Sequence, residues 1–491
     1  MNQQLVRQAG VLCHISSLPS HQHIGDLGPE AFKFVDFLHE IGAGVWQTLP
    51  LNMTHADGSP YQSLSAHAGN PEFISLEFLH EKKWLSKATL THKSLSKQQL
   101  INQAYKNYLT KPDAETQYAI SVFCEAQSFW LDDFALFLAL RQRFNLAGWF
   151  QWEDAYKNRD EASIKSATIL LAQEIGAIKF TQYLFFSQWL ALKSYANAKN
   201  IALFGDIPIF VSFDSADVWC HPHLFKLDAD KNMTVVAGVP PDYFSATGQR
   251  WGNPHYNWQA MQENGFSWWL QRMRTQNALF DMVRIDHFRG LEAAWEIPAT
   301  DETAINGYWV QAPGDQLLAV IKQNFPYMVL IAEDLGVITD EVNTLREKYG
   351  LPGMKILQFA FSGQEDNPYL PHHVQVDSVV YTGTHDNDTS LGWFNALGEQ
   401  ERDYFTQYFS ANAPEALLNM PQSLVEMALN CQAQLAIIPM QDILCLGTEH
   451  RMNIPGTAIG NWGWRFDWKQ LKVRQQTKIK TLIKKSKRLN T

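Results

Sequence analysis

Eight short runs of apolar residues recur along the chain, and each run ends in polar, glycine or proline residues. Most of them are almost continuous in apolar residues, which is typical of parallel strands buried on both faces. Helix-like stretches with apolar residues at helical spacing precede several runs. This alternation predicts an α/β fold, a (β/α)8 barrel of the TIM type that occupies the whole chain, residues 1–491. The runs are GVLCHISSLP from Gly10, VWQTLP from Val45, IALFGDIPIFV from Ile201, MVRIDHFRG from Met282, MVLIAEDLG from Met328, MKILQFAF from Met354, SVVYTGTHDND from Ser378 and QLAIIPMQD from Gln434.

Two of the gaps between these runs are too long to be ordinary barrel loops. About 150 residues separate the second run from the third, and roughly 70 separate the third from the fourth, whereas loops in compact domains are usually a few residues long. We therefore expect inserted, mostly helical subdomains on the C-terminal rim of the barrel, at residues 51–180 and 214–281. Only about 50 residues follow the eighth run, and a β-sandwich needs ~100, so no C-terminal sandwich is predicted.

Composition and charge narrow the class of function. Of the 491 residues, 46% are hydrophobic and the mean hydropathy is -0.25, values that fit a globular protein. The formal net charge of -10 is opposite to the charge that a nucleic-acid-binding protein usually carries. The 17 tryptophans exceed what a core needs, and flat aromatic rings are surfaces on which sugars and bases stack. Because the acidic charge disfavours bases, sugars are the better prediction.

The cysteines and the start of the chain favour a reducing cytoplasm. The five cysteines are scattered and form no CxxC pair, so neither a disulfide framework nor a zinc site is predicted. The stretch MNQQLVRQAGVLCHIS contains one arginine and no apolar core segment, unlike a signal peptide. No run of ~18 apolar residues is present, so no membrane span is expected. The chain contains no P-loop, and its paired histidines lack acidic partners at metal-site spacing, so no cofactor and no metal are expected.

The end of the chain is strongly basic. Residues 469–491 contain nine basic residues and no acidic residue. Such a segment could dock on nucleic acid or on anionic lipid. Its isoleucines and leucines fall on one face of a predicted helix, which favours a solvated C-terminal helix that closes the barrel.

Three predicted strands end in a carboxylate, namely Asp286, Glu333 and Asp386. Catalytic residues of barrel enzymes lie at the ends of the strands. Arg284 precedes Asp286 by two positions, so both side chains face the same way, and the guanidinium is expected to keep Asp286 ionised, as a nucleophile must be. Glu333 follows four apolar residues, and apolar surroundings raise a carboxyl pKa toward general-acid use. An ionised aspartate and a protonated glutamate are the pair that glycoside cleavage requires.

Each of these acids also has a purely structural interpretation. A single aspartate after a strand is more often the N-cap of the next helix than a catalytic group. Three carboxylates on the fourth, fifth and seventh runs, with arginine and histidine neighbours, make capping a weaker explanation for the whole set.

The stretches that hold these acids resemble a known family. RIDHFRG, AEDLG and GTHDND are similar to the catalytic strands of the α-amylase superfamily. From Gly10 to Phe466 the chain resembles the 4-α-glucanotransferases of glycoside hydrolase family 77, also called amylomaltases or disproportionating enzymes. The other matching stretches are GVLCHISSLPS at the start, SPYQSLSAHAGNP from Ser59, GDIPIFVSFDSADVW from Gly205, AGVPPDYFSATGQRWGNPHYNW from Ala237 and RMNIPGTAIGNWGWRF from Arg451.

The resemblance implies a retaining double displacement on α-1,4-glucans. A glucan segment would pass from a maltooligosaccharide donor to the 4-hydroxyl of an acceptor such as glucose or maltose. Asp286 would be the nucleophile, Glu333 the acid/base, and Asp386 the residue that grips the sugar and stabilises the transition state. The other implied substrate-binding residues are Arg284 and His385 beside the reacting glucose, Asp206 and Asn453 further round the barrel mouth, Tyr61 and Trp251 in the sugar subsites, and Tyr243 and Phe244 on a loop over the acceptor side.

Residues 240–254 are expected to form this acceptor-side flap. The segment mixes proline and glycine with three large aromatics, which suits a shaped mobile loop, although the same rings could instead bury the insertion against the barrel. Two departures from the family are visible. Ala246 replaces the usual glutamate of the flap, and no aromatic lies around Ala56, where some relatives carry a tyrosine of a second glucan site. A second site of that kind, and cyclisation that depends on it, are therefore in doubt.

Other functions remain as alternatives. An α-1,4-glucan hydrolase would use the same three acids with water as the acceptor, but the aromatic flap and the missing sandwich favour the transferase. A non-catalytic glucan-binding protein would be expected to have lost one of the carboxylates. A nucleic-acid or membrane protein would act through residues 469–491, and neither partner is expected here.

Overall fold

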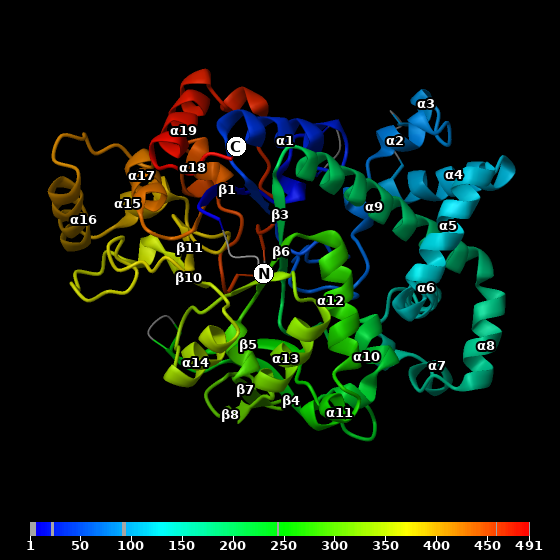
Figure 1. Cartoon of the computed structure of the whole chain (residues 1–491). Coiled ribbons are helices and arrows are strands. Elements are labelled where there is room, and N and C mark those ends of the chain that lie inside the picture. Colours follow the sequence, from blue (N-terminus) through cyan, green and yellow to red (C-terminus); the bar gives the residue numbers. More distant parts are fainter. Residues whose placement is uncertain (1–5, 21–23, 91–94, 243–244, 458, 491) are drawn as a thin grey trace.

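The computed structural model describes residues 6–20, 24–90, 95–242, 245–457 and 459–490. At its centre lies a sheet of eight parallel strands in the order β10-β11-β12-β1-β2-β3-β6-β9 (Figure 1). Each predicted run supplies one of these strands, which confirms the predicted barrel. The strands are β1 Gln8–Leu12, β2 Val45–Gln47, β3 Ala202–Ile207, β6 Met282–Ile285, β9 Val329–Ala332, β10 Gly353–Ile356, β11 Ser378–Tyr381 and β12 Leu435–Pro439.

The barrel closes between β9 and β10, which are the two ends of the strand order. The backbone N–H of Ala332 donates to the carbonyl of Pro352 at 2.9 Å. The backbone N–H of Met354 donates to Oδ1 of Asp334 at 2.6 Å. At this junction the carboxylate of Asp334, the residue after Glu333, accepts a hydrogen bond that a backbone carbonyl of a neighbouring strand would otherwise accept.

Apolar side chains fill the barrel interior, and helices cover its outside. The interior cluster includes Phe204, Ile331, Tyr381 and Ile437, all almost fully buried. No α-helix is present in the connection between β10 and β11, which contains only a 3-10 turn at Leu357–Phe359. Helix α12 Ser267–Leu279 lies at the end of the expected insertion at residues 214–281. The helices outside both expected insertions are α1 Pro29–Ile41, α13 Gly314–Asn324, α14 Asp340–Lys348, α15 Ser390–Ala396, α16 Glu399–Asn412, α17 Gln422–Asn430, α18 Met440–Ile443 and α19 Val473–Lys485.

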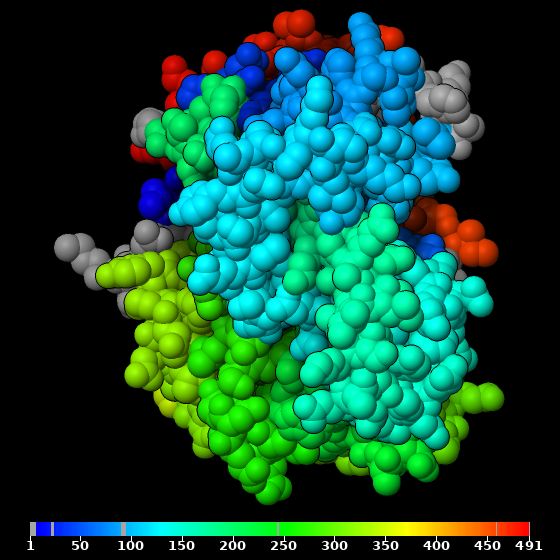
Figure 2. Space-filling view, turned by 90° about the vertical axis from the view of Figure 1, so that its right-hand side faces the viewer, coloured from blue at the N-terminus to red at the C-terminus, as the bar shows by residue number. Residues whose placement is uncertain are grey.

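A helical array lies between β2 and β3, where residues 51–180 are expected to form an insertion. It covers one side of the molecule (Figure 2). The last of its helices, α9, continues beyond residue 180 and packs against α1 and β3, so one helix belongs to both the array and the barrel wall. The helices are α2 Leu76–Glu81, α3 Lys87–Leu90, α4 Lys97–Thr110, α5 Ala114–Ala126, α6 Ser128–Arg143, α7 Asp154–Lys157, α8 Glu161–Leu170 and α9 Ala172–Ala198.

A four-stranded antiparallel sheet, in the order β5-β4-β7-β8, stands beside the barrel mouth. Strands β4 Val235–Val239 and β5 Gln249–Pro254 lie in the expected insertion at residues 214–281, with helices α10 Ala216–Cys220 and α11 Trp258–Glu263. Strands β7 Ala293–Pro298 and β8 Tyr308–Gln311 come from after β6, so the sheet extends beyond that range. The antiparallel sheet was not predicted from the sequence. Apolar and polar residues do not alternate regularly in its short strands, and β4 pairs with β7, which lies far away in the chain.

The basic C-terminal segment packs onto the barrel. Helix α19 buries Ile479, Leu482 and Ile483 and contacts α1, α17 and α18. Arg488 is fully buried and donates five hydrogen bonds to backbone carbonyls, among them those of Gln8 and Gln434 at the start of two barrel strands. These contacts fit a helix that closes the barrel.

All five cysteines are free thiols. Among the described residues, no helix is both long and apolar enough to cross a bilayer.

Candidate active site

A cleft of about 490 Å³ opens at the C-terminal ends of the barrel strands. It gathers residues from five barrel strand ends, from the first insertion and from the small sheet. Of the residues predicted from sequence, those that line it are Tyr61, Trp251, Arg284, Asp286, Glu333, Asp386 and Asn453. His385 and Asp206 join the same group through hydrogen bonds. Tyr243 and Phe244 lie outside the described residues.

None of the three strand-end carboxylates caps a helix. The N-caps of the elements that follow them are His287, Thr389 and Thr339, respectively for Asp286, Asp386 and Glu333. The capping interpretation is therefore wrong for all three acids, and their carboxylates are left for the cleft.

Arg284 is the centre of the charge network. In the parallel register of β3 and β6 it stands opposite Asp206, and its Nη1 lies 2.6 Å from Asp206 Oδ2. Its Nη2 lies 2.9 Å from Asp286 Oδ1 and 3.9 Å from Glu333 Oε2. The side chains of Arg284 and Asp206 are almost fully buried, whereas that of Asp286 is 28% exposed toward the cleft. One buried guanidinium thus serves three carboxylates.

Burial raises the pKa of both central carboxyl groups. It raises the pKa of Glu333 to about 8, against the opposing charge of Arg284. It raises the pKa of Asp286 to about 7, because the lowering by Arg284 is countered by the charges of Asp206 and Asp386. The expectation that the guanidinium keeps Asp286 ionised is therefore too simple, since that cation is shared. Arg284 lies closer to Asp286, at 2.9 Å, than to Glu333, at 3.9 Å, so its charge favours the proton of the pair on Glu333.

Tyr61 and His385 connect Asp206 to Asp386. The Tyr61 hydroxyl donates to Asp206 Oδ2 at 2.7 Å and lies 2.9 Å from Nε2 of His385. Nε2 of His385 also lies 3.3 Å from Asp386 Oδ2, so this nitrogen stands between the Tyr61 hydroxyl and the Asp386 carboxylate. The two rings are stacked, with centroids 5.3 Å apart. Burial raises the pKa of Tyr61 and lowers that of His385, which keeps both rings neutral.

Asp386 is held from the other side by the loop after β12. Nδ2 of Asn453 donates to Asp386 Oδ1 at 2.6 Å. The carboxylate therefore has a partner on each oxygen, His385 on one and Asn453 on the other.

Trp251 forms a wall of the cleft. It extends from β5 and meets the ring of His287 edge-on, with centroids 4.8 Å apart. Its ring is partly buried and reaches the cavity, so the structure favours a cleft position over a purely core position.

The cleft also contains residues that were not predicted from the sequence, among them His287, Phe359 and Trp462. The backbone N–H of His287 donates to Glu333 Oε2, and its φ of 50° turns this N–H toward the acid. Phe359 is 40% exposed just beyond β10, and Trp462 lies close to the Tyr61 and His385 rings. His287 and Phe359 follow the ends of barrel strands, and Trp462 lies in the stretch RMNIPGTAIGNWGWRF, so these positions were the signal of a cleft residue in the sequence.

Two polar atoms of the site are buried without a hydrogen-bond partner among the described residues. They are Oδ1 of Asp206 and Nε2 of His287. Buried polar groups are normally paired, so both atoms have capacity for a ligand or a water molecule. No group of three or more His, Cys, Asp or Glu side chains in the described part of the chain is arranged to hold a metal ion.

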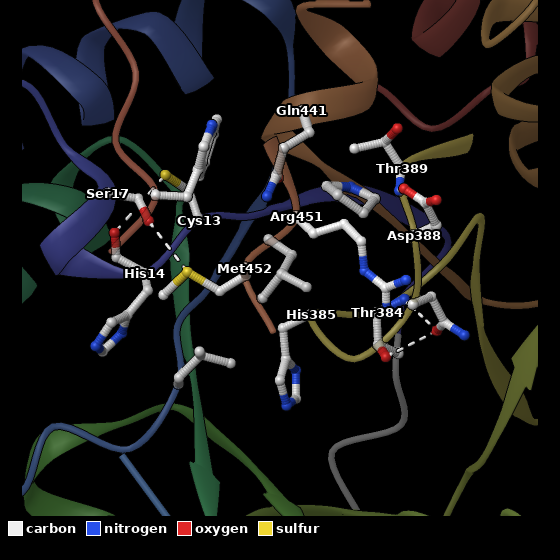
Figure 3. Close-up of a pocket in the computed structure, with 15 residues that line it drawn as sticks. Cys13, His14, Ser17, Thr384, His385, Asp388, Thr389, Gln441, Arg451 and Met452 are labelled. Atoms are coloured by element: carbon white, nitrogen blue, oxygen red, sulfur yellow. Dashed lines mark hydrogen bonds between the residues drawn. The ribbon is translucent and has the colours of Figure 1, made fainter. Parts of the chain in front are cut away.

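A second, much smaller pocket lies behind His385 (Figure 3). Cys13, His14 and Ser17 line it from the end of β1, and Arg451 and Met452 line it from the loop after β12. Burial lowers the pKa of His14 to about 3, so His14 is neutral.

Comparisons with known proteins agree with this geometry. Residues 13–471 match the family model described as 4-alpha-glucanotransferase. The 4-alpha-glucanotransferase of Thermus thermophilus is 44% identical over 99% of this chain and 100% of its own length, and that of Aquifex aeolicus is 43% identical over 94% and 95%. An amylomaltase from Streptococcus agalactiae, solved in complex with acarbose, superposes with a TM-score of 0.94 at 37% identity, covering 99% of this chain and 100% of that chain. An amylomaltase from Corynebacterium glutamicum, with a TM-score of 0.76 at 18% identity over 99% and 75%, shares the fold.

Proposed function

This chain belongs to the 4-alpha-glucanotransferase family and is a transferase of α-1,4-glucans, and we propose that it works by a retaining double displacement through a covalent glycosyl-enzyme. The observation that carries this mechanism is the pairing of Asp286 and Glu333 around one guanidinium, which lies 2.9 Å from Asp286 and 3.9 Å from Glu333. Such a pair offers a carboxylate nucleophile and a protonated acid in one cleft.

In the first step a carboxylate oxygen of Asp286 attacks the anomeric carbon of the donor. The bond from that carbon to the glycosidic oxygen breaks, and the leaving oxygen takes the proton of Glu333. The donor fragment with the new 4-hydroxyl departs, and the remaining glucanyl unit is bound to Asp286 as an ester.

In the second step the ionised Glu333 accepts the proton of the acceptor's 4-hydroxyl. The acceptor oxygen attacks the anomeric carbon, and the bond to Asp286 breaks. Two inversions restore the α configuration, and Glu333 is protonated again for the next cycle.

The surrounding polar groups are assigned to the sugar in the central subsite. Asp386, held by His385 and Asn453, grips its hydroxyls and stabilises the positive charge that develops at the anomeric carbon. Tyr61 and Asp206 extend this grip, with the unpartnered Oδ1 of Asp206 as a further acceptor. Trp251 lines the neighbouring subsite.

We also propose the substrates of the protein, the role of its insertions and its location in the cell. The donors are maltooligosaccharides and longer α-1,4-glucans, and glucose or maltose serves as an acceptor. The amylomaltase from Streptococcus agalactiae was solved in complex with acarbose, which supports a site for oligosaccharides in this chain. Residues 51–180 and 214–281 act as inserted subdomains around the barrel, with residues 240–254 as the acceptor flap. A cytoplasmic location follows the cysteine pattern.

Incubation with maltotriose alone tests this function. We expect free glucose together with a ladder of longer maltooligosaccharides, and almost no net gain in reducing ends, because transfer conserves the number of glycosidic bonds. If reducing ends rise steadily and no product exceeds the donor in length, the protein is the alternative α-glucan hydrolase.

A further inference from the structure

Arg451 joins two segments of the site from behind. It follows the 3-10 turn Thr448–His450 and lines the small pocket, not the sugar cleft (Figure 3). Its Nε donates to the carbonyl of Asn453 at 3.2 Å, and its Nη2 donates to the carbonyl of Asp386 at 3.0 Å. The guanidinium thus bridges two backbone positions that are far apart in the sequence.

The side chains of the same two residues meet on the cleft side. There the Asn453 amide donates to the Asp386 carboxylate at 2.6 Å. Asp386 and Asn453 are therefore connected twice, once through their side chains in the cleft and once through Arg451 at their backbones. The length of the outer bridge sets how far apart the two backbones stand, and so where the carboxylate points.

The loop that carries Asp386 is anchored at its two ends, and inside the loop the Tyr61 hydroxyl lies 2.9 Å from Nε2 of His385 and Thr448 donates to the carboxylate of Asp388 at 2.9 Å. At one end Thr382 donates to the buried Asp442, which also accepts from the backbone and hydroxyl of Ser390 at the other end. Gln358 donates to the carbonyl of Asp388. Between these ends, Arg451 is the side chain that the structure brings to the backbone carbonyl of Asp386.

We propose that Arg451 is a positioning residue of the transferase, which aims the Asp386 carboxylate at the reacting sugar by fixing the Asp386 and Asn453 backbones. The inference rests on the role proposed above for Asp386. An arginine suits this position because two nitrogens of one rigid plane reach two separate carbonyl groups. Lysine has a single nitrogen on a flexible stem and cannot span both.

A double-mutant cycle tests the proposal. Arg451→Met and Arg451→Lys are measured for kcat and KM on maltotriose, alone and combined with Asp386→Asn. A misplaced carboxylate lowers catalysis on the order of tenfold to a hundredfold, so both single variants are expected to lose kcat to that extent. In the Asp386→Asn background the additional loss should nearly vanish, because the group that Arg451 aims is no longer a carboxylate.

Two further measurements separate positioning from folding. Arg402→Met is the matched control, since Arg402 also donates to backbone carbonyls, but at the exposed end of α15. It should keep wild-type kinetics. Millimolar guanidinium, far below denaturing concentrations, should restore part of the kcat of Arg451→Ala and leave Arg402→Met unchanged.

The outcomes are distinct. An equal loss from Arg451→Met in both backgrounds, or no loss at all, overturns the positioning role while leaving the proposed function intact. Full activity of Asp386→Asn by itself overturns the proposed role of Asp386, and the inference with it.

Discussion

Nη2 of Arg284 lies 2.9 Å from Oδ1 of Asp286, just beyond the end of strand β6. The same guanidinium holds the buried Asp206 through its other terminal nitrogen. Asp286 therefore receives only part of one positive charge, and burial can raise its pKa to about 7. The nucleophile is ionised near neutral pH and not far below it.

The first prediction concerns the pH dependence of turnover. The active form of the free enzyme has Asp286 ionised and Glu333 protonated. The value of kcat/KM for maltotriose should rise as pH increases through about 7 and fall as it increases through about 8, the raised pKa values of Asp286 and Glu333. A stopped assay at about ten pH values from pH 5 to about 9 measures this bell-shaped pH profile. A plateau down to pH 5 would contradict the raised pKa of Asp286.

The raised pKa of Glu333 also affects stability. A carboxyl whose pKa is higher in the folded than in the unfolded protein binds more protons when folded, so stability falls as pH rises between its ordinary pKa of 4.5 and about 8. Glu333→Gln removes this dependence. Its free energy of unfolding should exceed that of the wild type by more at pH 8.5 than at pH 5, measured by urea denaturation. An advantage that is equal at both pH values would refute the raised pKa.

The third prediction separates the roles of the two central acids. An α-glucosyl fluoride needs no protonation to leave, so in Glu333→Ala the Asp286 carboxylate still attacks it and the glycosyl-enzyme accumulates. Azide needs no base, so it should restore turnover and give the α-glycosyl azide. On native glucan the variant should lose several kcal/mol of transition-state stabilisation, roughly 3 to 6.

Asp286→Ala provides the contrast in the same experiment. Without the nucleophile no intermediate forms, and any rescue by azide proceeds by direct displacement to the β-anomer. Product anomers are read by NMR. An α-azide from Asp286→Ala, or a β-azide from Glu333→Ala, would reverse the assignment of the two acids.

The fourth prediction tests the aromatic wall. Trp251→Ala should raise the ratio of hydrolysis to transfer several-fold, because a lost ring contact costs about 1 kcal/mol of acceptor binding and admits water. Trp309→Ala is the control, since this partly exposed tryptophan belongs to the same small sheet and does not line the cleft. The same change at Tyr243 and Phe244 tests the flap predicted from sequence. An unchanged ratio in Trp251→Ala would assign that ring to the core.

The fifth prediction concerns the C-terminal segment. Arg488→Met removes five hydrogen bonds to backbone carbonyls, and those of Gln8 and Gln434 lose their arginine donor, whereas the other three still accept from Arg7, so the free energy of unfolding should fall by about 2 to 4 kcal/mol. Arg474→Met, at an exposed position in the first turn of α19, should change it by less than about 0.5 kcal/mol. Urea titrations of both variants make the comparison. Equal stability of both variants would show that the segment does not hold the barrel.

The barrel was predictable because its strands are almost continuous apolar runs, each closed by polar residues. The place of Arg284 beside Asp286 followed from the period of two along a strand. The antiparallel sheet was not predictable in the same way, since β5 reads QRWGNP and shows no alternation. The missing helix between β10 and β11 also left no clear sign in the sequence.

The charge contacts of the site could not be predicted from the sequence without the fold. The sequence places Arg284 near Asp286, but only the register of β3 and β6 brings Asp206 against the same guanidinium. Burial is the main reason why the pKa of Asp286 is raised, and the charge of Asp206 adds to it. His287 was likewise missed, because its contribution to Glu333 comes from a backbone N–H in a left-handed conformation, which no side-chain pattern reveals.

The pairing of β4 with β7 in the antiparallel sheet limits which chain segments can be exchanged between related proteins. Strand β4 precedes β6 in the chain and β7 follows it, yet the two are paired from Val235–Pro298 to Gly238–Trp295. The hairpin that carries the flap is thus held by a segment on the far side of Asp286. A chimera that replaces residues 235–254 alone joins strands from two different proteins. With residues 240–254 as the proposed acceptor flap, acceptor preference is therefore not expected to transfer with residues 235–254 alone, and the exchanged segment has to extend from β4 through β6 to β7.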